Sequence, residues 1–255
     1  MEVYVSQFLI FVMLFARVTA LIVVAPILGH QSIPVQIKVA IGLFLAFVMY
    51  PNAAGTEQVV EAEFLPIVIM ALKEVIVGLI IGFATGLIFA GVRYAGDLIA
   101  MDIGISMAAM FDPESNTQSS IISEFLYLTM AMIFLLLNGH HFVLEALHLS
   151  YAAVPIGGLA VTGAVSAILI KLTGMTFVIA AKLAAPIMVS MFLINLAVSI
   201  LSRVMPQMNI FAVVFPVKIG VGFFVVMVSI PLLAFVFQKL LSSFEANILE
   251  LVKVM

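Results

Sequence analysis

Long apolar runs separated by short polar breaks dominate the sequence. The main runs cover Val5 to Leu28, Phe64 to Val92, Ile121 to Leu137, Ala164 to Arg203 and Ile210 to Phe237. A helix needs roughly 20 apolar residues to cross a bilayer, and a membrane segment satisfies its backbone polar groups best as a helix. The pattern therefore predicts an all-α, integral membrane-type protein whose helices are partly broken by Pro and Gly.

Several segments depart from a simple span. Ile37 to Tyr50 is shorter than the roughly 17 residues of a comfortable span. Ala164 to Arg203 is too long for one span, so it is either a long broken helix or a hairpin folded near Lys182 to Pro186. His140 to Tyr151 is typical of a short amphipathic helix, and Gln238 to Met255 of an amphipathic C-terminal tail.

Polar loops divide the chain without marking a domain boundary. We expect one domain over residues 1–255, with loops near 52–63, 112–120 and 155–163 and a polar break near 204–209. Ser120 is the predicted N-cap of the helix that follows the second loop, and Asn138-Gly139 its predicted end.

The composition agrees with a membrane protein. Hydrophobic residues make up 65% of the 255 positions and charged residues 9%, whereas a soluble domain carries roughly 25% charged residues. The net charge of −3 includes no basic run, which argues against nucleic acid as a partner. The chain has no Cys, so disulfides and thiolate chemistry are excluded.

Basic residues are not gathered in loops but lie within or beside the apolar runs. Each charge exposed to lipid costs a few kcal/mol, so we expect these side chains to face partner subunits or a water-filled passage. Arg93 and Asp97 are four positions apart and can pair on one helix face. The full set is Arg17, Lys73, Glu74, Arg93, Asp97, Lys182, Arg203 and Lys218.

Gly78, Gly82 and Gly86 recur at four-residue spacing in the third apolar run. Small residues at this spacing share one helix face and let another helix approach closely. The pattern indicates close helix packing, although a helix that merely tolerates glycine has the same pattern.

Candidate catalytic and metal sites are weak. His141, Glu145 and His148 share one helix face and are residue types that bind zinc or iron, but an amphipathic helix also gathers polar residues on one face. No nucleophile motif or phosphate-binding loop is present. Asp97 and Asp102 point to different faces, which disfavours an aspartyl protease. We expect no enzyme activity, no cofactor and no metal.

The polar break near 204–209 separates two apolar runs and is the strongest candidate for function. Polar backbone in so apolar a region is costly unless protein or water surrounds it, and methionine suits a surface that must adapt. We interpret the break, which contains Met205, Pro206, Gln207, Met208 and Asn209, as a movable constriction in which Met205 and Met208 line a surface that must seal and yield.

The sequence resembles the FliR family of flagellar type III export-gate membrane proteins, which are related to SctT-type injectisome subunits. The resemblance covers nearly the whole chain. It rests on Pro26-Ile-Leu-Gly29 with Ile33-Pro34 and Lys38, on Asp112-Pro113 and Leu137-Asn-Gly-His140, and above all on Asn195-Leu-Ala-x-x-Ile-Leu-Ser-Arg-x-x-Pro-Gln-Met-Asn-Ile-Phe211 followed by Phe215-Pro-Val-Lys218. Asp102-Ile-Gly-Ile-Ser106 and Ser199 depart mildly from the family pattern.

The resemblance implies long tilted helical hairpins in a hetero-oligomeric gate with several copies of two smaller relatives. Unfolded flagellar proteins would pass through its centre, and the loop Pro206 to Asn209 would act as a plug. A substrate-switching subunit is expected near the C-terminal region. The location implied is the bacterial inner membrane at the flagellar basal body, with membrane lipid as a further partner.

A secondary transporter is the alternative interpretation. Pro186, Pro206 and Pro216 would then break helices around a midplane ion or solute site. Such a protein is expected to show internal repeat symmetry, and the two halves of this sequence give no convincing match.

Overall fold

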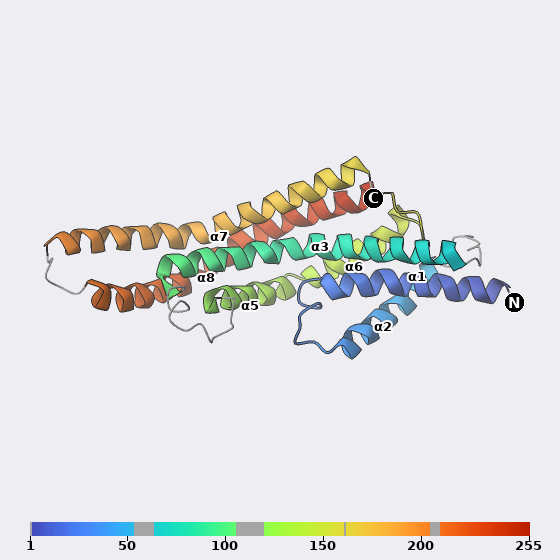
Figure 1. Cartoon of the computed structure of the whole chain (residues 1–255), viewed down its shortest axis with the longest axis horizontal. Coiled ribbons are helices and arrows are strands. Elements are labelled where there is room, and N and C mark those ends of the chain that lie inside the picture. The colour runs from blue at the N-terminus through green and yellow to red at the C-terminus, as the bar shows by residue number, and fades with distance from the viewer. Residues whose placement is uncertain (1, 54–63, 106–119, 161, 205–209) are drawn as a thin grey trace. The chain divides into compact units, whose positions relative to one another are not determined.

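Helices make up almost all of the described chain. The computed structural model describes residues 2–53, 64–105, 120–160, 162–204 and 210–255, and no strand occurs among them. The elements are α1 (Glu2–Val24), α2 (Val35–Ala53), α3 (Phe64–Ile103), α5 (Ile121–Leu136), α6 (Gly139–Ala153), α7 (Gly163–Val204) and α8 (Ile210–Val254) (Figure 1). The all-α prediction is confirmed.

Among the described residues, four helices are long and apolar enough to cross a membrane: α1, α3, α7 and α8. The number rises to five if α5 and α6 form one bent span. The region Ala164 to Arg203 is one helix with Pro186 inside it, so the hairpin considered from its length is wrong. The amphipathic tail from residue 238 is the end of α8 and not a separate element.

Two helix ends follow the sequence signals. The Ser120 side chain accepts a hydrogen bond from the backbone N–H of Ile122 over 3.2 Å, which confirms the predicted N-cap of α5. Asn138, between α5 and α6, has a φ of 60°. Asn tolerates this left-handed conformation better than most residues, and the chain therefore ends one helix and starts the next at this position.

The chain divides into two compact units. The first comprises Met1–Leu87, Asn138–Thr173 and Ser243–Met255, and the second comprises Ile88–Leu137 and Gly174–Ser242. The expectation of a single domain over 1–255 remains a prediction.

The first unit is built around α1, which packs on α2 and on the first half of α3 (Figure 1). Its core contains Ile10, Met13, Leu14, Ala46 and Ile156. The α1 members recur at helical spacing, so one face of α1 is buried in this core.

Glycines on α3 allow α1 to approach closely within this unit. A Cβ at Gly78 would collide with the Arg17 carbonyl oxygen, and one at Gly82 would lie 2.9 Å from the Leu21 carbonyl oxygen. A Cβ at Gly86 would be in ordinary contact, 3.7 Å from the Val24 oxygen. The face formed by the three glycines is therefore covered by a helix of the same chain, most tightly at Gly78.

The second unit packs aromatic rings around Phe89 of α3. Its ring centroid lies 5.6 Å from that of Tyr127, 5.3 Å from that of Phe134 and 6.2 Å from that of Phe237, all edge to face. This geometry is the favoured one for aromatic pairs. The ring of Phe89 thereby joins the second half of α3 to α5 and α8.

Candidate functional site

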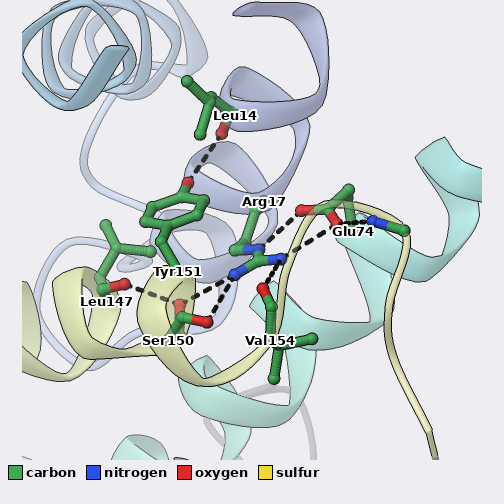
Figure 2. Close-up of polar contacts among 8 residues, drawn as sticks. Leu14, Arg17, Glu74, Leu147, Ser150, Tyr151 and Val154 are labelled. Atoms are coloured by element: carbon green, nitrogen blue, oxygen red, sulfur yellow. Dashed lines mark hydrogen bonds and ion pairs between the residues drawn. The ribbon is translucent and has the colours of Figure 1, made fainter. Parts of the chain in front are cut away.

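A buried ion pair between Arg17 and Glu74 is the most polar part of the first unit (Figure 2). Arg17 Nε donates to Glu74 Oε2 over 2.6 Å, and Arg17 Nη2 donates to Oε1 over 3.0 Å. Both residues are 0% exposed. Two parallel bonds between a guanidinium and a carboxylate give strength and fixed orientation, so the pair holds α1 and α3 in one register.

Carbonyl oxygens at the end of α6 complete the guanidinium shell. Arg17 Nη1 donates to the Ser150 carbonyl over 3.0 Å and to Ser150 Oγ over 3.2 Å, and Nη2 donates to the Val154 carbonyl over 3.1 Å (Figure 2). The ring of Tyr151 lies 4.4 Å from Arg17 Cζ, and its hydroxyl donates to the Leu14 carbonyl. Arg17 therefore connects its own helix, α1, to α3 and to the end of α6.

The turn after α6 is held by the two adjacent charges of α3. The Gly157 N–H donates to Glu74 Oε1 over 2.9 Å, and Lys73 Nζ donates to the Gly157 carbonyl over 3.0 Å. Gly157 has a φ of 73°, which a residue with a Cβ rarely adopts. We call Arg17, Lys73, Glu74, Ser150 and Gly157 the Arg17 cluster. Arg17 and Glu74 neutralise each other, and Lys73 is held by the Gly157 carbonyl, so the cluster is suited to fixing helices in place.

The Arg17 cluster corrects part of the sequence interpretation. Arg17 and Glu74 were expected to face partner subunits or a passage, yet each finds its counter-charge inside the chain. The two are 57 positions apart, and no spacing rule connects them. Ser150 and Tyr151 were missed because they are ordinary residues of an amphipathic helix.

The second unit holds a half-buried polar strip between α3 and α5. Arg93 does not pair with Asp97: Arg93 Nη2 lies 3.7 Å from Glu124 Oε2, and its Cζ lies 4.2 Å from the Tyr127 ring centroid. Asp97 Oδ1 instead accepts a hydrogen bond from Ser123 Oγ. The polar residues of α3 are thus used to attach α5, and the pairing expected from four-residue spacing is wrong.

Three cations of the predicted set, Lys182, Arg203 and Lys218, have no ion-pair or hydrogen-bond partner among the described residues. Lys182 and Arg203 are exposed, and Lys218 is half-buried. We still expect these three side chains to face partner subunits or a water-filled passage.

The predicted constriction lies outside the described residues, since 205–209 are not among them. The end of the helix that leads to it is described, and from Phe192 to Val204 no residue of α7 is buried. Ile200 is 67% exposed and Val204 71%.

The possible metal ligands on α6 do not form a site. His141, Glu145 and His148 are exposed, and within the described part of the chain no group of three or more His, Asp or Glu side chains is arranged to hold a metal ion.

Comparison with known sequences decides the family. The sequence profile of the bacterial export proteins, family 1, matches residues 8–244. This chain belongs to that family. The match covers all of α3 and α7, most of α1 and α8, and the whole Arg17 cluster.

The relatives of this chain include proteins named flagellar biosynthetic protein FliR. The chain is 30% identical to the protein of Bacillus subtilis (strain 168) over 247 residues, covering 95% of this chain and 94% of the relative. It is 30% identical to that of Escherichia coli (strain K12) over 218 residues, covering 86% and 83%. It is 28% identical to that of Aquifex aeolicus (strain VF5) over 247 residues, covering 94% of each chain. The similarity is spread over nearly the full length of these proteins.

Proposed function

We propose that this protein is a non-enzymatic subunit of the flagellar type III protein export gate in the bacterial inner membrane, at the flagellar basal body. Membership of the bacterial export proteins, family 1, supports export, and the names of the relatives support a flagellar role. Nearly full-length coverage favours a common role over a borrowed segment. It also favours the gate over a secondary transporter.

The exposed end of α7 carries the proposal on the structural side. Thirteen residues of an apolar helix, Phe192 to Val204, include none that is buried in the chain, and Arg203 stands among them. An exposed apolar surface of that length indicates a site that binds another protein or a membrane. Arg203 at its end favours a polar neighbour, such as another subunit or a water-filled passage.

The break between α7 and α8 is the proposed plug of the gate. Met205, Pro206, Gln207, Met208 and Asn209 would close the passage by shape and softness, because methionine adapts to irregular surfaces. Unfolded flagellar proteins would displace them. The partners would be several copies of two smaller gate subunits and the subunit that switches substrate class.

Deletion of residues 206–209 tests the plug. Membrane vesicles that contain the assembled gate should become leaky to ions, because a seal has been removed. Deletion of Ala54 to Glu57, four residues of another polar loop, is the matched control and should leave the vesicles tight. An assembled gate that stays impermeable without residues 206–209 would contradict the plug.

Purification tests the wider proposal. The chain extracted in mild detergent from a flagellated bacterium should bring other membrane subunits with it in a hetero-oligomer. Recovery as a stable monomer or homodimer, without other membrane proteins, would contradict a gate subunit.

A further inference from the structure

Charge is distributed unequally along the sequence. No Asp or Glu occurs between Glu145 and Glu245, a stretch that includes all of α7 and most of α8. The same stretch contains five cations: Lys171, Lys182, Arg203, Lys218 and Lys239. α7 therefore has no carboxylate of its own, and the two carboxylates of α8, Glu245 and Glu250, both follow Lys239.

The spacing of four of these cations is regular. Lys182 and Arg203 on α7 are 21 positions apart with no charged residue between them, and Lys218 and Lys239 on α8 are likewise 21 positions apart. At about 1.5 Å per helical residue, each interval is roughly 31 Å long. The hydrocarbon core of a bilayer is about 30 Å thick.

The two helices run in opposite directions (Figure 1), and residues 174–204 of α7 and 210–242 of α8 belong to the second unit. The α3 residues Phe89 and Gly91 set their relative level: Phe89 contacts Phe237, and Gly91 faces Ile179. Position 179 of α7 thus lies near the level of position 237 of α8. Lys182 and Lys239 therefore lie towards one end of the helix pair.

Arg203 lies 24 residues after position 179 on α7, and Lys218 lies 19 residues before position 237 on α8. Because the helices run in opposite directions, both cations lie towards the other end of the helix pair. Each end of the uncharged region consequently has two cations, one from each helix. Lys239 Nζ lies 4.5 Å from the ring centroid of Phe235, an arrangement that lets an ammonium remain at the edge of an apolar surface.

The surface between the two levels is apolar and largely uncovered. Phe192, near the middle of the α7 interval, is 59% exposed, and Val228, near the middle of the α8 interval, is 64% exposed. Only 17% of the most apolar 18-residue segment of α8 is buried within the chain. Lysine and arginine bind phosphate, and they reach the headgroup level from the ends of membrane helices.

We propose that, before other subunits cover it, the α7–α8 pair spans the lipid bilayer with Lys182 and Lys239 bound to lipid phosphates at one surface and Arg203 and Lys218 at the other. The partner of this surface is a lipid bilayer. In the chain alone, the ends of both helices that flank residues 205–209 then lie at a headgroup level and not at the bilayer midplane. This membrane arrangement is that of the chain alone, so it does not depend on the export function.

The absence of native cysteine makes accessibility mapping direct. Single cysteines would replace exposed residues at the two central positions, 192 and 228, and at four positions beside the cations. The latter are Ala181, Val204, Val217 and Gln238. Each full-length variant is reconstituted without partners into phosphatidylcholine–phosphatidylglycerol vesicles and treated on both sides with a charged maleimide.

The four end positions should react, and the two central ones at least tenfold more slowly. Central positions that react as fast as the ends would show a water-exposed hairpin and overturn the proposal. Protection of all six would also overturn it, because the cations would not then lie at the surface.

A charge variant separates phosphate binding from apolar length. In K182L/K239L the cysteines at 181 and 238 should react at least threefold more slowly, as that end enters the bilayer, while those at 204 and 217 keep their rates. Unchanged rates at all four would refute a role for the cations. If the double variant fails to insert, Lys182→Gln alone should slow labelling at 181 in the same direction, and an unchanged rate there would refute the role equally.

Discussion

Removing the negative charge of the Arg17 cluster is the sharpest test of how this fold is held together. Glu74→Gln keeps the length and shape of the side chain but leaves Arg17 without its counter-charge. The guanidinium remains fully buried, so water cannot replace the carboxylate. We therefore expect a large loss of stability from a nearly isosteric change.

The structure sets the size of that loss. Breaking a buried ion pair from one side costs about 3–5 kcal/mol, because an uncompensated charge stays buried. The carbonyls of Ser150 and Val154 still accept bonds from Arg17, so we expect the lower end, about 3 kcal/mol. For a chain of this length, 1 kcal/mol shifts the melting temperature by roughly 2–4 °C, and the expected shift is roughly 6–12 °C downward.

Thermal unfolding of the purified chain in mild detergent measures this shift, with monodisperse protein after heating as the readout. Glu145→Gln is the matched control: it is the same substitution on an exposed residue of the same unit, and it should change stability by at most about 0.5 kcal/mol. Equal midpoints for Glu74→Gln and Glu145→Gln would refute the buried pair.

The double variant Arg17→Met/Glu74→Met is measured in the same assay. Removing both charges leaves no unpaired ion, so the double variant should lose less stability than the two single Met variants lose in sum. Additive losses would mean that the two residues act separately.

Two further substitutions probe the backbone in the same assay. Gly78→Ala should destabilise the chain by about 1–3 kcal/mol, because its Cβ would meet the Arg17 carbonyl oxygen, whereas Gly86→Ala should be neutral or stabilising by up to about 1 kcal/mol; equal effects would contradict the tight contact. Asn138→Val should cost about 1–2 kcal/mol at a φ of 60°, while Asn138→Gly should cost nothing measurable, and a tolerated valine would contradict that backbone conformation.

Local signals in the sequence predicted the helices well. Apolar run length located α1, α3, α7 and α8, and the side chain of Ser120 gave the start of α5. These features depend on residues close together in the chain, where propensity, capping and hydrophobic period act. Length alone did not decide whether α7 is one long helix or a hairpin, and the structure shows one helix that contains Pro186 and continues to Val204.

The polar contacts were not predictable in the same way. Arg17 and Glu74 lie in different apolar runs, and only the approach of α1 to the Gly78 face brings them together. Arg93 and Asp97 did satisfy a local spacing rule, but tertiary contacts with α5 displaced that pairing. A charge inside an apolar run signals that a partner is needed, while the identity of the partner depends on how distant helices pack.

The cations within the apolar helices fall into two groups, one paired inside the chain and one without an internal ion pair, and the position of each cation explains its group. Arg17 lies within the apolar helix α1 and is neutralised by Glu74 of α3. Lys182, Arg203, Lys218 and Lys239 bracket uncharged helical stretches, so lipid phosphates or later partners can serve them. Because α1 depends on α3 and α6 for its counter-charge and its carbonyl acceptors, it should be stable in the membrane only after those helices have formed. Among the described residues, the cations of α7 and α8 have no ion-pair partner on the other helices. The exposed apolar surface of these two helices can therefore remain in contact with lipid until other subunits cover it.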